Sequence, residues 1–272
     1  VVIRGAGAAG VGIARLIRTA LLTAGMPPGE ALKRIALLDS HGLVVDDGPL
    51  DAHKREFAWP PAMAATHGMS KGSPRDLETV VRVMKPTMLV GTSGEPGTFT
   101  EGAIRAMGDA VERPVVFPMS NPTSKTEAHP KDILEWTAGR ALVATGSPFE
   151  PVTRGGRTYR IGQGNNAFIF PGVGLGVLLS QAREVSDEMF AAAALALAHC
   201  VTDEEIAAGT LFPRGRELRN VAASVAAAVI RTARDSGLGR QIRDEEIETA
   251  VDKGMWSPEY VPYDLAPTAS GG

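Results

Sequence analysis

A glycine-rich segment close to the start of the chain narrows the choice of fold more than any other part of the sequence. The segment, GAGAAG at residues 5–10, has the spacing GxGxxG. It follows the apolar run Val1 to Arg4 and precedes Val11 to Ala24, where apolar residues recur with a helical period. A glycine motif between a strand and a helix is typical of the first turn of a dinucleotide-binding α/β domain. A glycine-rich turn that binds nothing is the alternative interpretation.

The remainder of the first 145 residues repeats this alternation of short apolar runs and helical patterns. Short, continuous apolar runs are typical of parallel strands that are buried on both faces. Five such strands are predicted, at Val1 to Arg4, Ile35 to Leu38, Met88 to Val90, Val115 to Phe117 and Leu142 to Ala144. Helices are predicted at Val11 to Ala24, Leu77 to Met84, Thr100 to Met107 and Ile133 to Trp136. The sequence therefore predicts an α/β fold with a doubly wound, mostly parallel Rossmann-type sheet.

The chain becomes almost wholly helical from about residue 167. Helical patterns cover Phe168 to Ser180, Asp187 to His199, Leu218 to Ala233 and Asp244 to Lys253. We predict a Rossmann-type NAD(P)-binding core over residues 1–180, followed by a helical C-terminal extension over residues 181–272. Two arrangements stay open from the sequence alone. The helices either pack on the sheet, or they form a smaller unit that completes an N-terminal domain missing from this chain.

Each predicted strand ends in a loop of small or polar residues. The second strand ends at Asp39, where an acidic residue usually accepts hydrogen bonds from an adenosine ribose. Later strands end in Thr92-Ser93-Gly94, in Ser120-Asn121-Pro122 and in residues 145–148. Ligands of open α/β sheets bind at the carboxyl ends of the strands, so we expect these loops to contact a cofactor. Each loop alone, and Asp39 before Gly42, is also explained as an ordinary turn.

Two adjacent amide side chains, Asn165 and Asn166, precede an apolar helical pattern. One of them is explained as a helix N-cap. Two exceed what capping requires, and neutral amides suit contacts to a small carboxylic acid or to a nicotinamide carboxamide. Asn121 has the same chemistry, and Pro122 restricts its backbone to an extended conformation. We therefore expect all three amides to contact a ligand.

Composition excludes several classes of protein. The 28 Lys and Arg against 31 Asp and Glu give a net charge of -3, without long runs of like charge, which argues against nucleic-acid binding. The single Cys200 cannot form an internal disulfide, which favours a cytoplasmic location. No apolar run reaches the roughly 18 residues that cross a bilayer, so a soluble protein without a membrane partner is expected. The chain begins at Val1, without an initiator Met, and is expected to be a fragment.

Eight segments together resemble the NAD(P)-binding domain of malic enzymes, which oxidatively decarboxylate malate to pyruvate and carbon dioxide. The resemblance runs nearly from end to end of the chain. Its segments are GAGAAGVGIA from Gly5, LLDSHGLV from Leu37, HKREFA from His53, LVGTSG from Leu89, FPMSNPTSKTE from Phe117, TGSPFEPV from Thr145, GQGNNAFIFPGVGLG from Gly162 and MWSPEY from Met255.

The resemblance implies roles for residues at matching positions. Asp39 would lie near the adenosine ribose, and the pyrophosphate would be bound by Gly5, Ala6, Gly7 and Ala8. Malate and the nicotinamide end of the cofactor would contact Asn121, Asn165 and Asn166. Ser40 and Lys54 resemble residues that face the 2′-phosphate in NADP-dependent members, so NADP is expected in preference to NAD. Lys54 as an ordinary surface lysine is the alternative.

The family also implies groups that lie elsewhere. Its catalytic Tyr and Lys, and the carboxylates that bind Mg²⁺ or Mn²⁺, lie upstream of the glycine motif. No catalytic or metal-binding residue is therefore expected in this chain, and the chain alone is expected to be inactive. Malate and pyruvate are the expected small-molecule ligands, and a homo-oligomer is the expected assembly.

Two further functions are compatible with such a fold, because fold alone does not determine activity. One is a 2-hydroxy-acid dehydrogenase without decarboxylation, which is disfavoured because no strand end offers an obvious His–Arg pair. The other is a non-enzymatic NAD(P)-binding regulatory module. The sequence upstream of Val1 would separate these hypotheses, since a Tyr, a Lys and a closely spaced Glu-Asp pair would indicate malic enzyme.

Overall fold

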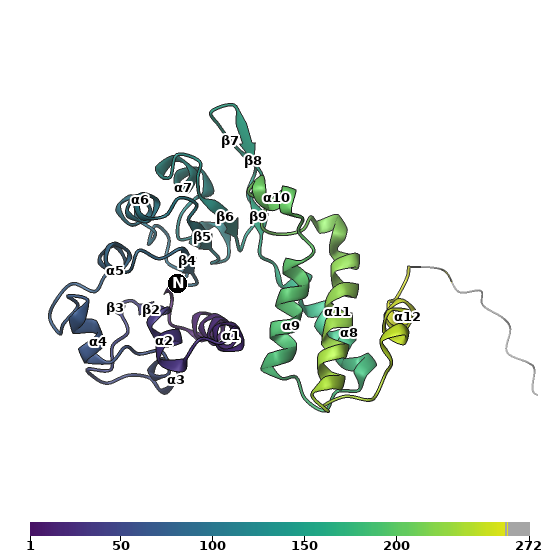
Figure 1. Ribbon diagram of the computed structural model, residues 1–272. Helices are drawn as coiled ribbons and strands as arrows, with labels where there is room; N and C mark the ends of the chain where they lie inside the picture. The colour runs from purple at the N-terminus through teal and green to yellow at the C-terminus, as the bar shows by residue number, and fades with distance from the viewer. Residues whose placement is uncertain (259, 261–272) are drawn as a thin grey trace, which may run out of the picture.

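The chain folds into an α/β unit and a helical unit that lie side by side (Figure 1). The computed structural model describes residues 1–258 and 260. Glu259, which belongs to the terminal MWSPEY segment, and residues 261–272 of the predicted extension lie outside the described residues. Within the described part, no helix combines the length and the apolar composition that crossing a membrane requires.

A seven-stranded sheet forms the centre of the α/β unit, and its strand order is β3-β2-β1-β4-β5-β6-β9. Only β3 runs antiparallel to its neighbour. The strands are β1 (Val2–Arg4), β2 (Ala36–Asp39), β3 (Gly42–Leu43), β4 (Met88–Gly91), β5 (Val115–Pro118), β6 (Leu142–Thr145) and β9 (Gly162–Gln163). The order from β3 to β6 follows that of a dinucleotide-binding Rossmann sheet, except that β3 is joined to β2 by a turn and runs antiparallel to it. The predicted doubly wound, mostly parallel sheet is confirmed.

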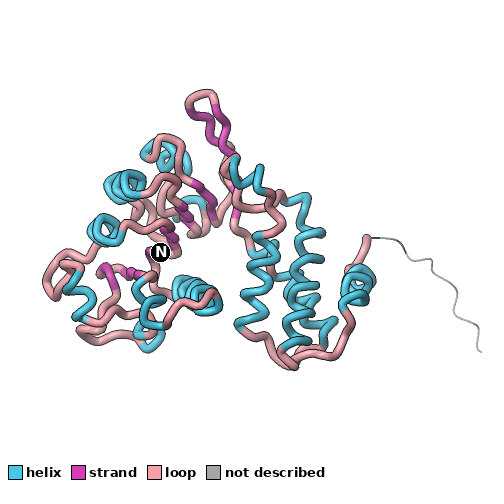
Figure 2. Tube along the Cα trace, viewed as in Figure 1, coloured by secondary structure: helices cyan, strands magenta, loops and turns pink. Residues whose placement is uncertain are grey.

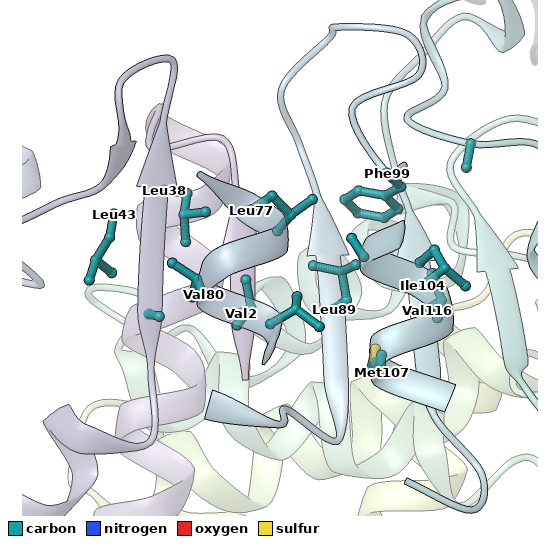
Figure 3. Packing of buried hydrophobic residues seen from close by; sticks show 14 of the residues in the cluster. Val2, Leu38, Leu43, Leu77, Val80, Leu89, Phe99, Ile104, Met107 and Val116 are labelled. Atoms are coloured by element: carbon teal, nitrogen blue, oxygen red, sulfur yellow. The ribbon is translucent and has the colours of Figure 1, made fainter. Parts of the chain in front are cut away.

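Residues alternate along the strands between two apolar cores, because successive strand side chains point to opposite faces of a sheet. Val2, Leu38 and Leu89 belong to one core, and Figure 3 shows them with Leu77 and Val80 from the covering helix. The other core takes the neighbouring positions, including Ile3, Leu37 and Val90. The five apolar runs are therefore continuous because both faces of the sheet are buried.

Helices cover both faces of the sheet. Helices α5 (Leu77–Met84), α6 (Glu101–Ala110) and α7 (Pro130–Trp136) contribute to the first core, and α1 (Ala8–Thr23) contributes to the second. Shorter elements of this unit are α2 (Pro28–Lys33), α3 (Ala52–Arg55), α4 (Pro61–Thr66) and the 3₁₀ turn η1 (Thr123–Lys125). Asp76 and Thr100 begin α5 and α6 by accepting hydrogen bonds from the backbone N–H groups of Thr79 and Ala103.

The helical unit has its own apolar cores. Its elements are η2 (Asn166–Phe168), α8 (Phe170–Ser180), α9 (Asp187–Ala198), α10 (Asp203–Ala207), η3 (Gly215–Glu217), α11 (Leu218–Asp235) and α12 (Asp244–Gly254). Figure 2 shows its main helices beside the sheet, and α9 contacts α1 across the boundary. The two arrangements left open by the sequence both stay predictions. The division at residue 180 stays a prediction.

Several elements of the fold were not predicted from the sequence, including the short helices α2, α3, α4 and α10. The short strands β3 and β9 each have only two residues, too few to give a periodic pattern. A hairpin of β7 (Val152–Arg154) and β8 (Arg157–Tyr159) projects beside β9. Its turn is Gly155-Gly156, and the two glycines have positive φ angles of 56° and 77°.

Candidate functional site

The candidate site lies at the carboxyl edge of the sheet, where β1 and β4 are neighbours. The chain leaves β1 toward β2 on one side and later returns to β4 on the other side, so the strand order reverses between them. Open α/β sheets bind ligands in the crevice at this point. The glycine motif follows β1 and the loop of Thr92, Ser93 and Gly94 follows β4, so the topology brings the two predicted segments together.

The glycine loop packs closely against the loop after β4. Gly5 has a φ angle of +122°, and a Cβ atom there would lie 2.6 Å from the carbonyl carbon of Thr92. The Thr92 hydroxyl donates a 3.1 Å hydrogen bond to the Gly5 carbonyl oxygen. Gly10 faces the same carbonyl group, and a Cβ atom at Gly10 would collide with it. The first and third glycines of the motif are therefore required by close backbone contacts.

The second glycine leaves open space at the beginning of α1. Gly7 is the N-cap residue, no side chain caps the helix, and a Cβ atom at Gly7 would have no neighbour within 4 Å. The first turn, which begins at Ala8, carries no acidic residue. Its free backbone N–H groups and the positive end of the helix dipole suit a phosphate group. The geometry of this loop therefore fits the pyrophosphate of a dinucleotide.

Asp39 and Lys54 form an ion pair at the end of β2. Lys54 Nζ lies 2.9 Å from Asp39 Oδ2 and 3.4 Å from Asp51 Oδ2. The backbone N–H of His41 donates a 2.9 Å hydrogen bond to Asp39 Oδ1. Burial raises the pKa of Asp39, but the hydrogen bonds from Lys54 and His41 outweigh burial and hold this pKa below its ordinary value. The hydrogen bond with Asp39 raises the pKa of Lys54, so both side chains are charged at neutral pH.

Several of the predicted residues line one cavity of about 300 Å³. Its lining includes Gly5, Ala6, Gly7, Asp39, Ser40, Lys54, Thr92 and Ser93. The lining also includes Arg4, His53 and Glu95, which the sequence analysis did not single out. Arg4 donates to the Asp39 carbonyl oxygen and forms a 2.8 Å ion pair with Glu95. In the sequence, only their positions could have indicated that Arg4 and Glu95 line this cavity. Arg4 directly precedes the glycine loop, and Glu95 directly follows the loop of Thr92, Ser93 and Gly94.

A second network at this edge centres on Glu127, another residue that the sequence analysis missed. Glu127 is fully buried and accepts hydrogen bonds from Ser93 and from Ser120. The Ser120 hydroxyl also accepts a 2.8 Å hydrogen bond from the backbone N–H of Gly94. The hydrogen bonds to Glu127 therefore connect the loop after β4 with the loop after β5. Nothing in the sequence pattern showed that Glu127 would face these loops.

Asn121 lies at the end of β5, beside the loop that follows β6. Its side-chain oxygen accepts a hydrogen bond from the Ser147 hydroxyl, and its amide nitrogen would lie 3.1 Å from a Cβ atom placed at Gly146. The peptide bond between Asn121 and Pro122 is cis. Asn121 is exposed and lies outside the lining of the 300 Å³ cavity.

Asn165 and Asn166 follow β9, which pairs in parallel with β6. They therefore emerge at the same edge of the sheet as the other predicted residues, and both are exposed. The Asn165 side-chain oxygen caps η2 by accepting a 2.9 Å hydrogen bond from the backbone N–H of Ala167. The Asn166 side chain has no hydrogen bond among the described residues. The N-cap interpretation thus applies to Asn165, whereas the amide group of Asn166 is available to contact a ligand.

A metal site is a separate question. Among the described residues, no group of three or more His, Cys, Asp or Glu side chains gathers closely enough to hold a metal ion.

The strand order and the glycine loop at its switch point define a class, the Rossmann-type dinucleotide-binding domains. Sequence comparison identifies the family within this class. The family described as "Malic enzyme, NAD binding domain" matches residues 1–234. The chain belongs to the malic enzyme family and comprises its NAD-binding domain.

Curated relatives agree with this assignment. The chain is 46% identical over 261 residues to the NAD-dependent malic enzyme of Shewanella frigidimarina, covering 95% of this chain and 46% of that protein. It is 43% identical over 264 residues to the NAD-dependent malic enzyme of Shewanella denitrificans, covering 97% of this chain and 47% of that protein. The chain therefore spans about half the length of the curated relatives it matches.

Solved structures show the same fold. The malic enzyme of Entamoeba histolytica superposes with a TM-score of 0.69 at 25% identity, covering 93% of this chain and 46% of that chain. The malic enzyme of Pyrococcus horikoshii superposes with a TM-score of 0.67 at 24% identity, covering 93% and 52%. The second likeness concerns the fold alone.

Proposed function

We propose that this chain is the cofactor-binding part of an enzyme that oxidatively decarboxylates malate to pyruvate and carbon dioxide with NAD as the oxidant. The observation that carries the proposal is the coincidence of the family match over residues 1–234 with a glycine loop whose geometry fits a pyrophosphate. When bound, NAD accepts the hydride that leaves the substrate carbon. The 2-hydroxy-acid dehydrogenase and the regulatory module have no comparable support.

The chain's own residues bind and orient in this proposal. Gly5 to Ala8 hold the pyrophosphate through backbone N–H groups, and Asp39 accepts hydrogen bonds from the adenosine ribose. Thr92 to Gly94 line the middle of the cofactor site. Asn121 and Asn166 donate amide hydrogens to the substrate carboxylate or to the nicotinamide carboxamide. Asn165 supports Asn166 by fixing the start of η2.

NAD, rather than the NADP expected from Ser40 and Lys54, is the proposed cofactor. Lys54 lies beside the carboxylates of Asp39 and Asp51, so its charge is already balanced. Arg4 is balanced in the same way by Glu95. A 2′-phosphate would therefore meet the Asp39 carboxylate, and neither Lys nor Arg among the described residues that line the cavity is unpaired to offset the repulsion. The curated relatives are named NAD-dependent, which supports the same choice.

Calorimetric titration of the chain tests the cofactor. We expect NAD to bind at least about ten times more tightly than NADP, a difference of about 1.4 kcal/mol. Asp39→Asn removes the repelling carboxylate and releases Lys54, so the preference should shrink. Asp46→Asn makes the same change in charge nearby, at a residue that pairs with Arg55 and does not line the cavity. Tighter binding of NADP than of NAD to the wild type would contradict the proposal.

Malate-dependent formation of NADH tests the reaction. It should be assayed with Mn²⁺ on this chain and on any longer polypeptide that contains it. We propose that Mg²⁺ or Mn²⁺ and the acid and base groups come from regions matching the other half of the curated relatives. NADH formation that continued unchanged without malate would contradict the assignment of substrate. A cytoplasmic location and a homo-oligomer stay predictions.

A further inference from the structure

Glu127 is a fully buried carboxylate in the segment between η1 and α7. Its Oε1 atom accepts hydrogen bonds from the backbone N–H of Ser93 at 2.8 Å, the Ser93 hydroxyl at 2.9 Å and the Ser120 hydroxyl at 2.5 Å. Its Oε2 atom accepts a hydrogen bond from the backbone N–H of Ser120 at 3.3 Å. Burying a carboxylate without a cationic partner is costly, and here four neutral donors compensate for it.

These contacts connect two loops that are 26 residues or more apart in sequence. Ser93 and Gly94 follow β4, whereas Ser120 and Asn121 follow β5. The Ser120 hydroxyl completes the connection by accepting the hydrogen bond from the Gly94 backbone. The end of β4 is shaped for this side chain, because a Cβ atom at Gly91 would lie 2.5 Å from Glu127 Cδ. One carboxylate therefore sets the spacing of both loops.

The position of this network along the sheet indicates which part of the cofactor it serves. The glycine loop and Asp39 lie at the ends of β1 and β2, the side proposed for the pyrophosphate and the adenosine. A dinucleotide that crosses the switch point places its other half over β4 and β5. The loops that Glu127 holds are the loops on that second side.

We propose that Glu127 is a positioning residue for the nicotinamide half of the cofactor site. It acts through Ser93, Gly94 and Asn121. Of these three residues only Ser93 also lines the cavity of the glycine loop and Asp39, and Glu127 itself does not line that cavity. The inference rests on the proposed function, since it assumes that the cavity at the switch point binds NAD. Glu127→Gln keeps the size of the side chain but directs an NH₂ group toward donors, so one of the two serine N–H groups loses its acceptor.

Calorimetry with two probes, NAD and ADP-ribose, tests this role, because ADP-ribose lacks the nicotinamide ring. For Glu127→Gln we expect the affinity for NAD to fall about tenfold and the affinity for ADP-ribose to change less than twofold. Ser120→Ala removes one donor to the carboxylate and the acceptor of the Gly94 N–H but keeps the carboxylate and its other donors, so its selective loss should be smaller, about threefold. If Glu127→Gln does not fold, the Ser120→Ala variant still tests whether this network serves the nicotinamide half. A purely structural role would not distinguish the two probes.

Thr137→Val is the matched control. Thr137 is also buried, and its hydroxyl bonds the Ile133 carbonyl oxygen and the Ala141 N–H near the amino end of β6, away from the carboxyl edge. It should lower the melting temperature without changing either affinity. An equal loss of both probes in folded Glu127→Gln, or no loss of either, would overturn the inference and leave the proposed function standing. Failure of the wild type to bind NAD and ADP-ribose would overturn both.

Discussion

Gly10 has less room for a side chain than any other residue of the glycine loop. Gly10→Ala should lower the free energy of unfolding by about 1 to 3 kcal/mol, because its methyl group would push the Gly5 carbonyl away. The same displacement should weaken the binding of NAD. Both effects can be measured by urea unfolding and calorimetry.

Gly12, one half-turn further along α1, provides the control. A Cβ atom at Gly12 would have no neighbour within 4 Å. Gly12→Ala should therefore stabilise the chain by about 0.5 to 1 kcal/mol, as expected for alanine in a helix, and leave NAD binding unchanged. Equal effects of the two substitutions would show that the contact with Gly5 is unimportant.

The Asp39–Lys54 pair should make stability depend on pH. The pKa of Asp39 is lowered from its ordinary value of 3.8, so the folded chain binds this proton less readily than the unfolded chain does. Its contribution is therefore present above about pH 4 and is lost as the pH falls through the lowered pKa. Wild type should exceed Asp39→Asn in stability by at most about 1 kcal/mol at pH 6, because the pair is partly exposed.

The comparison is made by urea unfolding of both proteins at pH 6 and pH 3. The difference between wild type and Asp39→Asn should shrink at the lower pH. Asp46→Asn, whose parent carboxylate pairs with Arg55 and is about half exposed, controls for the general effect of acid. A difference that grows as the pH falls would contradict the assignment of Asp39 as a stabilised carboxylate.

At the scale of elements, helix α8 packs closely against α11 at two glycines of α8. A Cβ atom at Gly172 would lie 2.6 Å from Val225 Cβ, and one at Gly176 would lie 2.7 Å from Val229 Cβ. The two glycines are one helical turn apart, so they form a single face. Gly176→Ala should therefore separate the helices and lower the free energy of unfolding by about 1 to 3 kcal/mol.

Gly174 lies between these two glycines on α8 but has open space at its Cβ position. Gly174→Ala should raise the free energy of unfolding by up to about 1 kcal/mol, because alanine favours the helix. Thermal and urea unfolding of the two variants in parallel measure the contrast. If Gly176→Ala is as stable as Gly174→Ala, the close packing of α8 on α11 is wrong.

At the scale of the whole molecule, α8 should unfold with the helical unit and not with the sheet. Val173 on α8 shares an apolar core with Val225 and Val229 on α11. In native-state hydrogen exchange at increasing urea concentration, the amides of α8 should therefore share the opening free energy of α11. Their exchange should differ from that of β1 and β4. Exchange of α8 together with β4 would favour the predicted division at residue 180 instead.

Much of this fold follows from the sequence because it depends on local patterns. Apolar runs such as Ile35 to Leu38 mark strands with two buried faces, and the glycine spacing at residues 5–10 marks the turn into α1. Helices α5 and α6 were predicted within a few residues, because apolar residues recur with a helical period in both segments. The family could also be inferred, since its motifs are contiguous segments of sequence.

Other features were decided only by the tertiary structure. Strand β9 has two residues and no period of its own, yet its pairing with β6 brings Asn165 and Asn166 to the carboxyl edge. The balance of Lys54 by Asp39 and the burial of Glu127 beneath Ser93 and Ser120 depend on side chains from distant segments. Sequence spacing determines which residues lie on one element, whereas contacts between elements arise only when the sheet and its helices pack together.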